Sequence, residues 1–482
     1  MKLPATRGSI VALASALLIG ACAAPSVERV DDQGERIAAE PATAGIDVEY
    51  EYYTLDNGLK VVLSRDASVP TATVAVYYNI GLRIEPRERT GFAHLFEHMM
   101  FQGSANLGKM EFVKLIQSNG GVLNGSTRFD YTNYFQVVPS NTLETILWAE
   151  ADRMAGLAIT QENLVNQQGV VKNEVKVNVL NQPYGGFPWL DLPQYANENW
   201  YNAHNFYGDL EHLDAATLED VREFFDNYYA PGNAALVVVG DFDADQTRRW
   251  IEQYFGPIAA RDVPPQPDIS EPRQTKEKRV QRTDPLAPRP GLAIGYHVPP
   301  RGTPEHFAFG LLDQILLQGD DSWLNQQLAK KKGYTSTVSG GINLLGNMFN
   351  YAGPMLWIAY LIHDPEHDAD TILADFDATI ERLQNEPLTQ AELDRALTKM
   401  RSGLYDVLGS GTRFGLADLL ASYALFDDDP GGVNRIEAGL RAVTPELIMR
   451  TAREYLRPTN RTVLELEPGQ APVATAEAEE AA

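Results

Sequence analysis

Two histidines and a glutamate stand at helical spacing: His94, Glu97 and His98 form the pattern H-x-x-E-H. On a helix with ~3.6 residues per turn, positions i, i+3 and i+4 lie within an arc of about 100°. The two imidazoles can therefore bind one zinc ion, and the carboxylate can take a proton from a water molecule beside it. The pattern predicts a zinc site. The alternative is two surface histidines near a glutamate on an ordinary amphipathic helix.

The composition is that of a globular protein. The chain has 482 residues, of which 44% are hydrophobic and 22% charged, so it is long enough for two or three domains with proper cores. Its formal net charge of −25 argues against a nucleic-acid partner, because phosphate binding needs clustered cations. Such a charge suits basic peptide substrates, although an acidic surface is more often a solubility feature.

The first 22 residues are predicted to be an export signal. Lys2 and Arg7 precede an apolar run, residues 10–19, that is too short for a permanent transmembrane helix. Small residues then lead directly to Cys22, the only cysteine, as in a bacterial lipoprotein signal. We therefore expect Cys22 to be lipidated and the protein to face the periplasm from a membrane, with the outer membrane preferred. The alternative is an ordinary cleaved signal in which the cysteine is incidental.

Beyond a polar tether, residues 23–47, the chain repeats itself. Pro231 and Asn233, which lead into an apolar strand, return near the end as Pro458 and Asn460 before a second strand. In each half, strands are grouped with helices between them and few parallel crossovers are needed. This order predicts an α+β fold with two homologous domains, each a mostly antiparallel sheet with helices on one face.

The domain limits follow from composition. We expect an N-terminal zinc-binding domain at residues 48–257 and a homologous C-terminal domain at residues 291–467. A proline-rich, charged linker, residues 258–290, separates them. Residues 468–482 are predicted to be an acidic, solvated tail.

Longer motifs resemble one peptidase family. HLFEHMMFQGS, GGVLNGSTRFDYTNYFQVVP, VVKNEVKVNVLNQPYG and YYAPGNAALVVVGDFD are similar, in order and spacing, to the pitrilysin/insulinase/mitochondrial processing peptidase family of inverted zincins. The resemblance covers residues 47–467. It implies a zinc-dependent endopeptidase whose chain forms half of a clamshell of four such domains.

The resemblance also implies a third zinc ligand. In the family this ligand is a glutamate on a later helix, and Glu174 stands at the matching position, so one zinc per chain would be held by His94, His98 and Glu174. Glu162 is the nearest rival, but it stands at a helix start, where a carboxylate favours the helix dipole. One departure is Gln167, at a position where the family usually has a second glutamate. It leaves open whether the metal site is weakened.

A candidate substrate strand follows two helix-stopping glycines. In the family, the strand that matches residues 122–127 is an edge strand to which the substrate adds as another strand, and Asn124 matches a position that contacts the peptide backbone. The alternative is an ordinary edge strand with a turn-forming Asn-Gly pair.

The second half is predicted to lack the zinc chemistry. By the repeat, Gly310, Asp313 and Gln314 stand where His94, Glu97 and His98 stand in the first half, and they cannot form this site. Active members of the family also use an arginine and a tyrosine that bind the substrate carbonyl.

Those two positions are Ala329 and Ser336 in this chain. The resemblance therefore implies a heterodimer with a homologous subunit that supplies the arginine–tyrosine pair. The alternative is that Tyr334, which is out of register, or a lysine of residues 330–332 substitutes.

These observations together predict a zinc-dependent endopeptidase subunit outside the cytoplasm, in which Glu97 moves the proton. Two alternatives belong to other classes: a non-catalytic scaffold subunit of a heteromeric peptidase, and a lipid-anchored peptide-binding protein. Only the enzyme needs the complete H-x-x-E-H pattern.

Overall fold

The computed structural model describes residues 45–469. The predicted signal with Cys22, most of the tether and nearly all of the acidic tail lie outside the described residues. Among the described helices, none combines the length and apolarity needed to cross a membrane.

The first half contains a six-stranded sheet in the order β1-β2-β6-β3-β5-β4. Only the pair β2–β6 is parallel, and β4 forms one edge. The central strand β6 is rich in valine and buried along its whole length, so both faces of this sheet are covered there. The strands are β1 (Glu51–Thr54), β2 (Lys60–Arg65), β3 (Thr71–Tyr78), β4 (Val122–Thr127), β5 (Thr132–Pro139) and β6 (Ala234–Gly240).

The second half contains a five-stranded sheet in the order β7-β11-β8-β10-β9. This order repeats that of β2-β6-β3-β5-β4, and again only one pair, β7–β11, is parallel. The predicted fold class, α+β with two mostly antiparallel sheets, is confirmed. The strands are β7 (Lys278–Asp284), β8 (Gly291–His297), β9 (Ser339–Ile342), β10 (Leu356–Ile362) and β11 (Arg461–Pro468).

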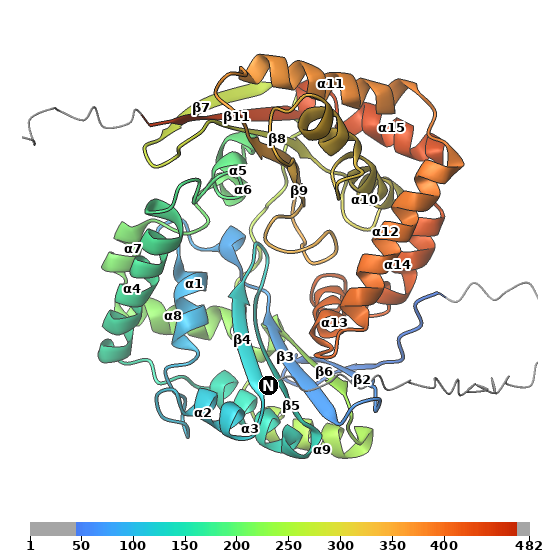
Figure 1. Cartoon of the computed structure of the whole chain (residues 1–482). Coiled ribbons are helices and arrows are strands. Elements are labelled where there is room, and N and C mark those ends of the chain that lie inside the picture. Colours follow the sequence, from blue (N-terminus) through green and yellow to red (C-terminus); the bar gives the residue numbers. More distant parts are fainter. Residues whose placement is uncertain (1–44, 470–482) are drawn as a thin grey trace, which may run out of the picture. The chain divides into compact units, whose positions relative to one another are not determined.

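Several helices in both halves begin at side-chain caps, for example at Thr160 and Thr303. Thr217 and Thr389 each form a capping box with the carboxylate three residues later, as the sequence indicates. The first half carries α1 (Phe92–Met99), α2 (Glu111–Ser118), α3 (Leu143–Ala155), α4 (Gln161–Val175), α5 (Asp191–Ala196), α6 (Trp200–Ala203), α7 (Leu210–Ala215), α8 (Leu218–Tyr228) and α9 (Ala244–Phe255). The second half carries α10 (Pro304–Leu316), α11 (Ala369–Asn385), α12 (Gln390–Leu408), α13 (Phe414–Asp427), α14 (Gly432–Arg441) and α15 (Pro445–Tyr455) (Figure 1).

The two halves exchange helices, in that each half packs one of its helices against the sheet of the other half. One face of the first sheet packs on the helices of its own half, whereas α13 of the second half packs against β3 and β6 on the other face (Figure 1). In return, α5 of the first half packs on β8 and β11. The exchange explains why β6 is apolar without alternation, since both its faces meet helices.

A buried carboxylate on α13, that of Asp418, joins the two halves. Asp418 accepts hydrogen bonds from the hydroxyls of Tyr77 (2.8 Å) and Tyr131 (3.1 Å) in the first half. It also accepts one from Asn350 Nδ2 (3.1 Å), in the loop that follows β9. Burial raises the pKa of Asp418, and these three donors oppose that rise. The network fixes the first sheet against two elements of the second half.

Candidate metal centre

Helix α1 carries the predicted zinc motif, and the backbone is constrained where this helix begins. Gly91 has a φ of 87°, which a side chain would strain, and no side-chain cap is present. Instead, the buried carboxylate of Glu85 accepts hydrogen bonds from the backbone N–H groups of Gly91 (2.9 Å) and Ala93 (2.6 Å). Burial raises the pKa of Glu85 to about 8, while these two donors lower it. The first turn that presents His94 is therefore held by a carboxylate from outside the helix.

The structure brings the three predicted ligands together. His94 Nε2 lies 3.6 Å from Glu174 Oε1, and His98 Nε2 lies 3.3 Å from Glu174 Oε2. The two imidazole Nε2 atoms are 3.3 Å apart. All three donor atoms lie within 4.8 Å of one another, with His94 buried and the other two partly buried. Glu162, the rival ligand, is exposed in the first turn of α4 and is not part of this cluster.

These residues fit a zinc ion. Two imidazole nitrogens and one carboxylate are a donor set of catalytic zinc sites, which keep a fourth position for water or substrate. Burial, followed by the neighbouring His94, lowers the pKa of His98, and the adjacent His94 imidazole lowers the pKa of Glu174. Both shifts favour the deprotonated forms that bind metal.

Glu97 lies on the same face of α1 and is fixed by the edge strand β4. The Thr127 hydroxyl donates a hydrogen bond of 2.7 Å to Glu97 Oε2. A Cβ on Gly125 would lie 3.4 Å from Glu97 Cγ, so the strand passes close beside this side chain. Sequence reasoning missed Thr127. Period-2 alternation along β4, which puts Gly125 and Thr127 on one face, could have identified it once the strand was known to lie beside α1.

Asn124 lies on the exposed edge of the same strand. Its side-chain Oδ1 accepts a hydrogen bond from the next backbone N–H, that of Gly125 (2.9 Å). Within the described residues, β4 pairs only with β5, so its other edge carries unpaired backbone groups. The predicted role of Asn124 in binding a peptide stays a prediction.

Gln167 is buried beside the metal cluster. Its Nε2 donates to Asn166 Oδ1 at 2.8 Å, and a hydrogen bond between Gln167 and His98 is among the minor influences on the His98 pKa. The glutamine therefore contacts a ligand without adding a charge to the site.

The counterparts of the zinc motif lie on α10 and offer no comparable donor set. Asp313 is buried, and Trp357 Nε1 donates to its Oδ1 at 2.6 Å. Burial raises the pKa of Asp313 to about 7. Gly310 and Gln314, which replace the two histidines, supply no metal-binding nitrogen.

The residues at the expected arginine and tyrosine positions also lack those groups. Ala329 is buried in the helical turn Asn325–Lys331, and Ser336 is exposed. The Tyr334 hydroxyl donates to Asp375 Oδ2 on α11 at 2.6 Å, and Lys332 Nζ lies 2.9 Å from the same oxygen. The Tyr334 hydroxyl is thus already hydrogen-bonded to a residue of α11.

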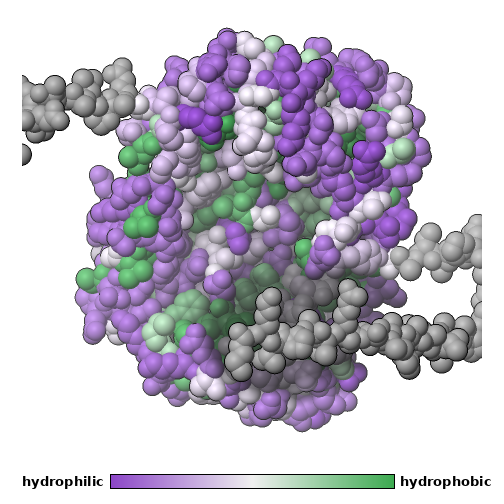
Figure 2. Space-filling view, viewed as in Figure 1, coloured by the Kyte–Doolittle hydropathy of each residue, from purple (hydrophilic) through white to green (hydrophobic). Residues whose placement is uncertain are grey.

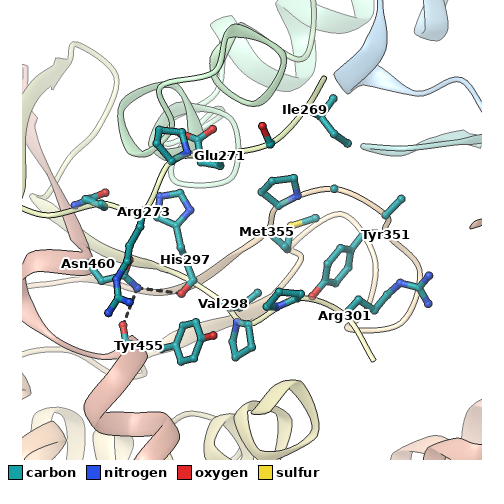
Figure 3. A pocket seen from close by; sticks show the side chains of 18 of the residues that line it. Ile269, Glu271, Arg273, His297, Val298, Arg301, Tyr351, Met355, Tyr455 and Asn460 are labelled. Atoms are coloured by element: carbon teal, nitrogen blue, oxygen red, sulfur yellow. Dashed lines mark hydrogen bonds between the residues drawn. The ribbon is translucent and has the colours of Figure 1, made fainter. Parts of the chain in front are cut away.

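Figure 3 shows a pocket of about 700 Å³. Its wall includes linker residues such as Glu271, and Asn460 on its floor donates to the carbonyls of His297 (3.0 Å) and Tyr455 (2.8 Å). Two of its arginines are paired within the pocket, Arg301 with Asp427 and Arg273 with Glu454. Because none of the zinc-site residues lines it, this pocket is separate from the candidate metal centre.

Two family models match the chain. The model described as insulinase (peptidase family M16) matches residues 60–184, which hold the three ligands and Glu97. The model described as the peptidase M16 inactive domain matches residues 215–400, which hold their counterparts on α10.

Individual proteins are similar over nearly the whole described chain. A protein of Helicobacter pylori named zinc protease PqqE is 27% identical over 425 residues, which cover 87% of this chain and 93% of that protein. The beta subunit of the mitochondrial-processing peptidase of Bos taurus is 22% identical over 466 residues, covering 94% and 91%.

Solved structures agree with this likeness. A crystal structure of a protease from Helicobacter pylori matches with a TM-score of 0.81 and 27% identity, covering 87% of this chain and 100% of that one. The periplasmic protease PqqL of Escherichia coli matches with a TM-score of 0.70 and 16% identity, a likeness of fold alone. This match covers 88% of the present chain but 48% of PqqL.

Proposed function

Because this chain belongs to the M16 (insulinase) family of peptidases, we propose that it is a zinc-dependent endopeptidase subunit that cleaves extended peptides or small unfolded proteins. The observation that carries this proposal is the convergence of His94, His98 and Glu174 on one point, with Glu97 on the same face of α1. A pure scaffold or peptide-binding protein has no use for a proton acceptor beside such a donor set.

The chemistry divides between the metal and the protein. When bound, zinc would polarise the scissile carbonyl and make water a stronger acid. Glu97 accepts the proton of the attacking water and later passes it to the leaving amine nitrogen. Thr127 holds one oxygen of this carboxylate, which leaves the other oxygen for the proton.

The edge strand β4 offers a place for the substrate backbone. An extended peptide can add to the unpaired edge as another strand, and this mode fixes the backbone while tolerating many side chains. The space-filling view is hollowed at the centre of the face shown, and apolar side chains are visible in the hollow (Figure 2). Such surroundings favour substrates that are unfolded and partly apolar.

The second half lacks the expected arginine and tyrosine, and this suggests that a partner supplies them. An oxyanion donor is worth about 3 kcal/mol of transition-state stabilisation, or roughly a hundredfold in rate. Ala329 and Ser336 cannot donate as arginine and tyrosine would, and the Tyr334 hydroxyl already donates to Asp375. We therefore propose a heterodimer with a homologous subunit that supplies this pair. Two similar proteins support this proposal. The periplasmic protease PqqL of Escherichia coli is about twice as long as this chain, which leaves room for a second pair of such domains, and the bovine mitochondrial-processing peptidase protein is named as a subunit.

A scaffold role is the second candidate, since the model that matches residues 215–400 is described as an inactive domain. In that case the chain would fold and bind metal but would not cleave. The proposed location, facing the periplasm through a lipid on Cys22, is common to both candidates.

Cleavage of a library of internally quenched peptides tests the proposal. We expect the mature chain to cleave slowly alone and roughly a hundredfold faster with its homologous partner. A zinc chelator should abolish both rates, and added zinc should restore them. Metal-loaded chain that cleaves no peptide with any homologous subunit would favour the scaffold instead.

A further inference from the structure

A tyrosine ring lies edge-on against the first predicted zinc ligand. The ring centroids of Tyr207 and His94 are 5.4 Å apart at an interplanar angle of 70°. The Tyr207 ring also meets the Trp189 ring, at a centroid distance of 5.4 Å and an interplanar angle of 68°. Tyr207 is therefore part of the wall of the metal centre, although it stands on the segment between α6 and α7.

The backbone at Tyr207 is held against the start of α1. A Cβ on Gly208 would lie 2.4 Å from Gly91 Cα, so only glycine permits this approach. Asp209 N donates to Thr90 Oγ1 at 3.0 Å, and Tyr207 N donates to Asn205 Oδ1 at 3.1 Å. Because the residues on both sides are fixed, the Tyr207 ring keeps a defined position relative to His94.

The Tyr207 hydroxyl is available as a donor. Within residues 45–469 it makes no hydrogen bond, in contrast to the Tyr334 hydroxyl, which donates to Asp375. Burial raises the pKa of Tyr207, and the nearby charges of Glu174 and Glu97 raise it further. The hydroxyl therefore lies within electrostatic reach of both carboxylates of the site.

We propose that Tyr207 is a further catalytic residue, whose hydroxyl donates a hydrogen bond to the scissile carbonyl oxygen of the substrate. This inference rests on the proposed peptidase function. As water attacks the carbonyl carbon, the π electron pair moves to the carbonyl oxygen, and a donor placed there stabilises the growing charge. Tyr207 keeps its own proton, and Glu97 remains the group that takes the proton of the attacking water. The chain thus carries one oxyanion donor of its own.

The structural alternative is that the ring only supports His94. Tyr207→Phe separates the two roles, because phenylalanine keeps the ring and loses the hydroxyl. The matched control is Tyr254→Phe, which removes an exposed hydroxyl on α9 that donates to Glu144 Oε1. Zinc content and melting temperature should match the wild type in both variants.

The first arm measures turnover by the metal-loaded, mature full-length chain. Tyr207→Phe should lower kcat roughly 10- to 100-fold with little change in KM, because the hydrogen bond strengthens only as charge develops. Tyr254→Phe should leave kcat unchanged. An unchanged kcat in Tyr207→Phe would overturn the inference.

The second arm measures affinity for a phosphinic peptide, whose tetrahedral phosphorus imitates the transition state. Its Kd should rise in Tyr207→Phe by about the same factor as kcat falls, whereas the Kd of an uncleaved substrate peptide, measured in a Glu97→Gln background, should not change. Equal losses for both ligands would mean a purely structural role and would overturn the inference alone. A wild-type chain that neither cleaves peptides nor binds the phosphinic peptide would overturn the proposed function, and this inference with it.

Discussion

The Thr127 hydroxyl donates a hydrogen bond of 2.7 Å to Glu97 Oε2, and this bond joins the edge strand β4 to helix α1. The strand offers its free edge to a peptide backbone, and the helix carries the residue that we expect to move the proton. Together with the close approach of Gly125 to Glu97 Cγ, this bond sets the distance between the predicted substrate strand and the predicted base. This distance determines whether the attacking water and the scissile bond meet in the required geometry.

Thr127→Val should lower kcat roughly 10- to 150-fold, since a hydrogen bond to a charged group contributes about 1.5–3 kcal/mol and valine cannot donate. Zinc content should stay at the wild-type level, because no ligand is changed. Thr127→Ser keeps the donor and should recover most of the lost rate. Steady-state kinetics of the three proteins check this. Equal kcat for Thr127→Val and wild type would show that Glu97 needs no such support.

Asp313 should give the folded protein a measurable pH dependence of stability. Its pKa is about 7 in the folded protein against an ordinary 3.8, so the folded state keeps this proton to higher pH than the unfolded state. The stabilisation is complete below pH ~4 and is lost as the pH rises towards 7, at up to about 1.4 kcal/mol per pH unit. Asp313→Asn removes this contribution. Urea unfolding between pH 4.5 and 7.5 should therefore show a flatter profile for Asp313→Asn, and identical slopes would contradict the assignment.

Asp418→Ala should destabilise the contact between the halves by about 2–4 kcal/mol, because Tyr77, Tyr131 and Asn350 lose their shared acceptor in a buried place. Asp394→Ala, an exposed carboxylate on α12, is the control and should change stability by less than about 0.5 kcal/mol. The measurement is the urea midpoint with its m-value. A similar small shift in both variants would mean that the network contributes little.

Cys22→Ser tests the predicted anchor. With the cysteine, the exported protein should fractionate with membranes after a salt wash, because two lipid chains anchor stably where one is marginal. With serine it should be released into the soluble periplasmic fraction. Continued membrane attachment of Cys22→Ser after the wash would refute lipidation as the anchor.

The sequence predicted α1 and its motif well, because helical spacing alone places His94, Glu97 and His98 on one face. The two sheets were also predictable, because local sequence patterns reveal both the repeat and the order of strands and helices along the chain. The position of Glu174 depended on family resemblance, because a lone glutamate on a helix has no local signature of ligation.

Contacts between distant elements could not be predicted. Thr127 and Tyr207 reach the site only through the packing of β4 and the segment after α6 against α1, which no spacing in the sequence encodes. The apolar helix α13 could be recognised as buried, yet nothing in its composition indicates that it covers the first sheet and not the second. Tertiary packing decides such partners.

Metal content and turnover, measured together on Glu97→Gln and Glu174→Gln, test the central claim most directly. The wild type should hold about one zinc per chain and cleave peptides. Glu174→Gln should lose most of the zinc, because a ligand is removed, and turnover should fall with it. Glu97→Gln should keep the zinc and lose turnover, because only the proton acceptor is removed. Full peptidase activity in Glu97→Gln, or full zinc retention in Glu174→Gln, would contradict the account.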